Sequence, residues 1–130
     1  MLLDTSGLLC LHHQPEPFHD EACRAYRAAV VRLAHGYILA EFVALAQARR
    51  LPRLAALAFV TDLVANPDIE MIWVDASLHE KAMSLLQRRL DKNYSLCDAV
   101  SFILMRERNI QEALTTDRHF AQEGFRKLLG

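Results

Sequence analysis

The sequence feature that most constrains the fold is a set of three carboxylates that stand alone in long apolar segments. Asp4, Glu41 and Asp98 are the only Asp, Glu, Lys or Arg residues within residues 1–15, 36–48 and 93–105, respectively. Apolar segments are buried in folded proteins, and an ionised carboxylate buried without a partner costs several kcal/mol or more. The sequence therefore predicts that these carboxylates share a partner, and the simplest shared partner is a divalent cation.

Size and composition predict one compact domain over residues 1–130. Hydrophobic residues make up 52% of the chain and charged residues 24%, a balance typical of globular rather than disordered proteins. The formal net charge of −1 excludes attraction of nucleic acid by overall charge. With no membrane-spanning apolar run, no signal-peptide pattern and three cysteines without C-x-x-C spacing, we expect a cytoplasmic protein with reduced thiols and no membrane partner.

Short strand-like segments alternate with helical segments along the chain. The expected strands are residues 1–4, 36–38, 69–74, 113–116 and 125–129. The expected helices are residues 5–12, 17–33, 39–50, 52–66, 77–90 and 95–107, with a helical turn at residues 118–122. Strands separated by helices predict an α/β fold, a three-layer α/β/α arrangement with a short central parallel sheet of four to five strands.

Four acids fall where such a sheet places its ligands, beyond the carboxyl ends of the strands. Asp4 ends the first expected strand and Asp117 directly follows the fourth, and Glu41 and Asp98 lie in the first turns of helices. Clustered carboxylates repel one another, and a hard cation bound by oxygen ligands relieves that repulsion. We expect Mg²⁺ or Mn²⁺, because Cys97 is the only sulfur or imidazole ligand directly adjacent to one of these acids in the sequence.

Helix capping is the alternative explanation for the same acids. Asp4 and Asp117 precede helices that they could cap, and Asp98 follows Ser95 at the spacing of a capping box. The helix dipole favours an anion at the position of Glu41, although its apolar helix offers no cationic neighbour. Capping therefore explains Glu41 least well.

The other reactive or bulky side chains are interpreted as structural. None of the six histidines has the spacing of a metal motif such as H-E-x-x-H, so we expect them on the surface or in loops. Cys97 is expected to be a small buried hydrophobe, because no histidine suits it as a catalytic partner. Trp73 is expected in the core.

Four segments resemble the motifs of the PIN domain family, in the same order and with similar spacing. They are MLLDTSGLL at the start, YILAEFVALAQAR, YSLCDAVSFILMRERNI and ALTTDRHFAQEGF. The resemblance covers the whole chain. It implies that the acidic site consists of Asp4, Glu41, Asp98 and Asp117, which would act as catalytic and metal-binding residues.

The resemblance also implies a function. PIN domains of this kind are Mg²⁺- or Mn²⁺-dependent ribonucleases that cleave single-stranded RNA, and small single-domain members resemble VapC-type toxins of type II toxin–antitoxin pairs. A homodimer and a cognate antitoxin protein are implied by the resemblance alone.

Around this acidic site we expect supporting hydroxyls and a rim that contacts RNA. Ser6 and Thr115 are placed to orient carboxylates through hydrogen bonds. RNA must approach acidic groups, so cations are expected at the rim. The candidate RNA-binding residues are Arg49, Arg50, Lys92 and Tyr94. Ordinary solvated helix ends are the alternative explanation for these charges.

Other functions remain open at this level. A non-toxin PIN nuclease that processes RNA and a non-catalytic interaction module have the same sequence pattern. An aspartyl-nucleophile phosphatase also needs an Asp after the first strand, but Ser6 stands where that class requires a second Asp.

Overall fold

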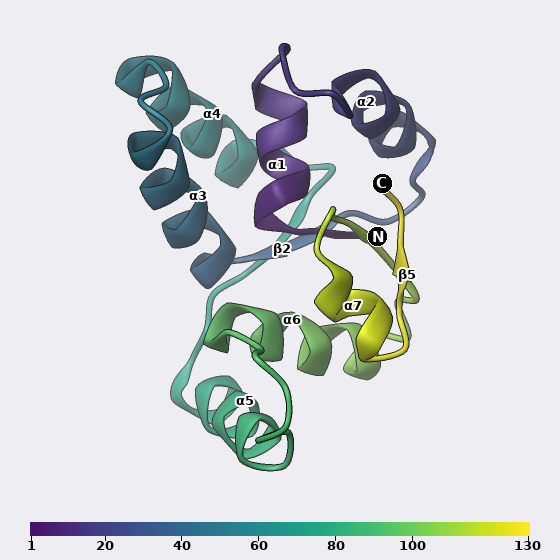
Figure 1. The fold of residues 1–130 in the computed structure, drawn as a ribbon. Helices are drawn as coiled ribbons and strands as arrows, with labels where there is room; N and C mark the ends of the chain where they lie inside the picture. Colours follow the sequence, from purple (N-terminus) through teal and green to yellow (C-terminus); the bar gives the residue numbers. More distant parts are fainter.

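Five short parallel strands form one sheet in the computed structural model, which describes residues 1–130 (Figure 1). The strands are β1 (Leu2–Leu3), β2 (Leu33–His35), β3 (Glu70–Ile72), β4 (Glu112–Leu114) and β5 (Arg126–Lys127). Their order across the sheet is β3-β2-β1-β4-β5, and every neighbouring pair is parallel. The predicted short parallel sheet is confirmed.

Seven helices surround the sheet. They are α1 (Thr5–His12), α2 (His19–Ala28), α3 (Gly36–Ala48), α4 (Arg53–Ala65), α5 (Ala76–Gln87), α6 (Leu96–Glu107) and α7 (Arg118–Gln122). Figure 1 shows α1 to α4 on one side of the sheet and α5 and α6 on the other, which confirms the three-layer arrangement. All the helices are too short or too polar to cross a lipid bilayer.

The central strands are buried on both faces, as expected for a parallel sheet between helix layers. Leu2, Leu3, Ala113 and Leu114 have no exposed surface. The first helix packs directly on β4 because Gly7 has no side chain: a Cβ there would lie 2.0 Å from the carbonyl oxygen of Leu114. This close approach holds the start of α1 beside the carboxyl end of β4.

The second strand lies three residues earlier than predicted. It spans Leu33–His35, and residue 36 already begins α3. The strand was missed because it contains His35, which is fully buried and has its Nε2 atom 2.8 Å from Ser101 Oγ. Burial lowers the pKa of His35 to about 3, so the ring is neutral. The expectation that all histidines lie on the surface or in loops is wrong for this residue.

Two helix boundaries also differ from the prediction. The helix expected at residues 17–33 ends at Ala28, where Arg32 Nε donates a hydrogen bond of 2.9 Å to the carbonyl oxygen of Tyr26. The helix expected at residues 77–90 spans Ala76–Gln87 and is capped by Asp75, whose Oδ1 accepts from the Leu78 backbone at 2.8 Å. In both places a side chain outside the helical repeat satisfies the terminal backbone groups.

Candidate metal centre

Asp4 and Thr115 lie side by side because they follow neighbouring strands. Leu3 of β1 pairs with Leu114 of β4, so the next residue of each strand emerges at the same point of the sheet edge. Thr115 Oγ1 donates a hydrogen bond of 2.7 Å to Asp4 Oδ2. Ser6 Oγ lies 3.1 Å from Thr115 Oγ1. Thr115 therefore orients Asp4 directly, and Ser6 acts on it through Thr115.

Burial makes Asp4 difficult to ionise. Its side chain is only 4% exposed, and burial raises its pKa to about 7, with further increases from the negative charges of Asp98 and Glu41. The hydrogen bond from Thr115 opposes this shift only in part. Asp4 is therefore close enough to Asp98 and Glu41, the two carboxylates predicted to share a partner with it, for their charges to act on it.

Asp98 combines a capping role with a place in the acidic site. Ser95 Oγ accepts a hydrogen bond from the Asp98 backbone at 3.0 Å, and Asp98 Oδ2 accepts one from the Ser95 backbone at 3.1 Å, which completes a capping box at the start of α6. Burial, followed by the negative charge of Asp117, raises the pKa of Asp98. Its hydrogen bonds involve only Oδ2, so Oδ1 remains free to bind a ligand.

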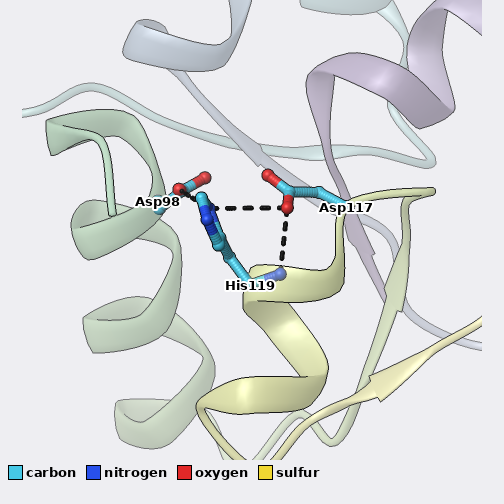
Figure 2. Close-up of side chains that lie close together, drawn as sticks. All are labelled: Asp98, Asp117 and His119. Atoms are coloured by element: carbon cyan, nitrogen blue, oxygen red, sulfur yellow. Dashed lines mark hydrogen bonds and ion pairs between the residues drawn. The ribbon is translucent and has the colours of Figure 1, made fainter. Parts of the chain in front are cut away.

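Asp117 caps α7 and brings His119 into the site (Figure 2). Asp117 Oδ1 accepts a hydrogen bond of 2.9 Å from the His119 backbone. The His119 ring turns toward both acids, with Nδ1 3.0 Å from Asp98 Oδ2 and 3.4 Å from Asp117 Oδ1. Ligand atoms of the three residues lie within 4.8 Å of one another.

His119 is the site residue that the sequence analysis missed. It was expected on the surface, but its side chain is only 20% exposed and lies between two acids. Its spacing two residues after Asp117 is the signal in the sequence that could have placed it near the site.

Glu41 lies at the rim of the site. Although its segment is apolar, Glu41 itself is exposed, so the prediction that this carboxylate is buried is wrong. Burial raises the pKa of Cys97, and the charges of Glu41, Asp4 and Asp98 raise it further. All three acids therefore lie near the Cys97 thiol. The Cys97 thiol therefore stays protonated, and its predicted role as a buried hydrophobe is consistent with its 7% exposure.

The donor set fits a divalent metal ion. Carboxylate oxygens of Asp98 and Asp117 and the Nδ1 atom of His119 are close enough to share one ion. Burial, and after it the charges of neighbouring acids, raises the pKa values of both Asp4 and Asp98, so a bound cation would favour their ionised forms. Oxygen and imidazole ligands suit Mn²⁺, and oxygen ligands suit Mg²⁺.

Comparison with known proteins identifies the fold family. The sequence matches the family model of the PIN domain over residues 1–125. This chain belongs to the PIN domain family. It is 30% identical over 126 residues to the 23S rRNA-specific endonuclease VapC20 of Mycobacterium tuberculosis, a match that covers 96% of this PIN domain and 95% of the relative. The crystal structure of M. tuberculosis VapC20, described as a Sarcin-Ricin loop cleaving toxin, matches with a TM-score of 0.89 and 28% identity over 99% of this chain and 98% of that chain.

The predicted RNA-binding residues of this PIN domain lie in different surroundings. Tyr94 is buried, and its ring packs edge-on against Phe102 and His119 with centroid separations of 5.0 and 5.3 Å. Its burial contradicts its predicted place on an RNA-binding surface; instead, it supports the His119 ring. Lys92 is exposed, with Nζ 3.6 Å from Asp91 Oδ2.

Arg49 and Arg50 are exposed at the end of α3. Arg49 follows Glu41 by eight positions, which correspond to about 12 Å of helix and separate these arginines from the acids. Arg49 also forms an ion pair of 2.9 Å with Glu16. Lys92 is thus the predicted cation that lies close in the chain to the start of α6 at Leu96.

Proposed function

We propose that this protein is a metal-dependent endoribonuclease that cleaves single-stranded RNA and acts as the toxin of a type II toxin–antitoxin pair. The observation that carries the proposal is the convergence of acidic side chains at the carboxyl end of a PIN-domain sheet: one follows β1, two lie in α3 and α6, and one caps α7. The similarity to VapC20, an rRNA endonuclease, supports the choice of an RNA phosphodiester as substrate.

In this proposal Asp98, Asp117 and His119 hold Mg²⁺ or Mn²⁺, and Asp4 and Glu41 complete the acidic site. A divalent cation supplies charge neutralisation at the phosphate and lowers the pKa of water. Thr115 keeps Asp4 in one orientation, and the capping box does the same for Asp98. Asp4 and Asp98 are buried, whereas Glu41 is exposed and can be reached by a polymeric substrate.

A homodimer and a cognate antitoxin belong to the same proposal. Helix α4 presents apolar side chains to solvent: Leu54 is 84% exposed, Leu57 38% and Val64 43%. An apolar helix face of this kind is typical of a surface that another protein covers. We assign it to a second copy of the chain, in keeping with a VapC-type assembly.

The first prediction concerns RNA cleavage. Purified protein is expected to cleave a labelled single-stranded RNA and an rRNA stem–loop with Mg²⁺ or Mn²⁺, and to lose activity in EDTA. Asp98→Asn is expected to reduce cleavage by about 100-fold or more, because even residues that only support metal ligands commonly affect activity by about 10- to 100-fold. The measurement is the initial rate on denaturing gels.

Asp62→Asn is the matched control, because Asp62 is exposed on α4 and forms no ion pair. Circular dichroism shows whether each variant is folded. Undiminished cleavage in EDTA, or by folded Asp98→Asn protein, would contradict the proposal. Absence of cleavage by the wild type under all metal conditions would favour a non-catalytic interaction module.

A further inference from the structure

The single tryptophan of the chain lies at the surface, not in the core where it was predicted. Trp73 is 61% exposed and directly follows β3, whose last residue Ile72 pairs with His35 of β2. Its position after a parallel strand puts it at the carboxyl edge of the sheet, the same edge as Asp4 and Asp117. A large aromatic ring is therefore exposed on the side of the molecule that carries the acidic site.

The ring of Trp73 is held against the start of α3. A Cβ atom at Gly36 would lie 3.1 Å from Trp73 Cε3 and 3.5 Å from Cζ3, so the ring lies over the glycine backbone. The absence of a side chain at Gly36 gives the ring a flat support. One part of the indole is thus fixed on the protein while most of its surface stays open to solvent.

The path from Trp73 to the acidic site is short. Strand β2 separates β3 from β1, and neighbouring strands are about 4.8 Å apart, so the ends of β3 and β1 are about 10 Å apart along the sheet edge. Tyr37 directly follows Gly36 in α3. Tyr37 and Glu41 are one helical turn apart, so they lie on neighbouring parts of the α3 surface. A few nucleotides of extended single-stranded RNA can span this distance.

Polar surroundings distinguish this ring from a protein-docking patch. Asp75 and Ser77, two and four residues after it in the chain, are both exposed. The neighbouring Tyr37 hydroxyl lies 2.9 Å from His79 Nδ1, so it also presents polar atoms. Interfaces between proteins need a contiguous apolar centre. A single exposed aromatic ring in polar surroundings is better suited to a nucleobase than to a protein partner, since every base can stack on an aromatic ring.

We propose that Trp73 is a base-stacking subsite that holds one nucleotide of the single-stranded RNA while a neighbouring phosphodiester lies at the acidic site. This inference rests on the proposed ribonuclease function and deepens it. Stacking on the indole positions the RNA strand along the sheet edge, and it favours unpaired over duplex RNA, because a base must be free of its stack to lie on Trp73.

The test uses the fact that Trp73 is the only tryptophan. Titration of a short single-stranded RNA into the intact protein in EDTA is expected to quench the tryptophan fluorescence, whereas the same sequence as a duplex leaves it unchanged. Fluorescence anisotropy of labelled RNA is expected to show binding weaker by about 5- to 100-fold in Trp73→Ala, the range for loss of one stacked base. Trp73→Phe is expected to restore most of the affinity.

Leu90→Ala is the matched control, because Leu90 is 87% exposed and lies outside the helices in the segment between α5 and α6. Steady-state cleavage with Mn²⁺ gives a second measurement: Trp73→Ala is expected to raise KM and leave kcat nearly unchanged. If Trp73→Ala binds RNA with the affinity and KM of the wild type, the proposed subsite is refuted and the proposed nuclease function still stands. If Trp73→Ala keeps the RNA affinity of the wild type but changes its oligomeric state, the ring belongs to a protein interface. If the wild type neither binds nor cleaves RNA, both proposals are refuted.

Discussion

Asp4 illustrates at the residue scale how a buried carboxylate depends on a cation. In the metal-free protein its pKa is raised to about 7, first by burial and then by the charges of Asp98 and Glu41. The unfolded chain ionises this carboxyl near its ordinary value of 3.8. Between these two values the folded protein holds a proton that the unfolded chain has lost, so raising the pH through this range removes stability.

The prediction is a pH-dependent difference between wild type and Asp4→Asn in the absence of metal. The variant is expected to gain stability relative to wild type as the pH rises from about 4 to about 7, by up to about 4 kcal/mol, because its amide does not ionise. Urea denaturation in EDTA at several pH values measures this difference. A difference that stays constant over this range would contradict the raised pKa of Asp4.

At the element scale, an ion-pair network holds α7 against α6 and the end of α5. Glu123, which follows α7 and is 9% exposed, accepts hydrogen bonds from Arg89 at 3.0 and 3.2 Å and from Arg106 at 2.6 Å. These bonds lower the pKa of Glu123 against the opposing effect of burial. Because α7 carries His119 and begins at Asp117, the network fixes the position of half of the candidate metal centre.

Glu123→Gln is therefore expected to destabilise the protein and weaken metal binding. Loss of the charge leaves Arg89 and Arg106 without their acidic partner, at a cost of about 1–3 kcal/mol, less than for a fully buried pair because both arginines are partly exposed. Glu112→Gln is the control: its ion pair with Arg126 is exposed and is worth at most about 1 kcal/mol. Thermal unfolding and Mn²⁺ titration calorimetry measure the two effects; equal behaviour of both variants would show that the network does not support α7.

At the scale of the whole molecule, the two ends of the sheet differ in chemistry. The carboxyl end carries the acidic side chains and the exposed Trp73. A cavity of about 700 Å³ lies at the opposite, amino end, where its lining includes Met1, Val31 and Glu112. The proposed RNA site therefore lies at the opposite end of the sheet from this cavity.

Binding of a metal ion at the acidic end is expected to stabilise the whole fold. At an Mn²⁺ concentration about 100 times its dissociation constant, linkage adds about 2.7 kcal/mol to the free energy of unfolding. The melting temperature of the wild type is expected to rise with Mn²⁺, with a much smaller rise in His119→Ala, which lacks one donor. Differential scanning calorimetry measures the shift, and an equal rise in His119→Ala would remove this residue from the metal site.

The sequence by itself determined the parallel α/β fold, the family and the candidate acids of the site. Apolar runs and helical periodicity are properties of neighbouring residues, so they located β1, β4 and most helices without knowledge of the packing. The order and spacing of the four family motifs are likewise read from the sequence alone. Where a single polar residue interrupted an apolar run, as His35 does in β2, local pattern and tertiary burial disagreed, and the strand was misplaced.

Only the tertiary structure decided how the side chains converge. The strand order puts Thr115 beside Asp4, the turn of α7 directs the His119 ring between Asp98 and Asp117, and the rotation of α3 leaves Glu41 exposed. Trp73 is exposed because β3 ends at the sheet edge, although its hydrophobic side chain alone indicates the core. Distances between residues far apart in the chain depend on packing across the sheet, and no periodicity along the sequence encodes them.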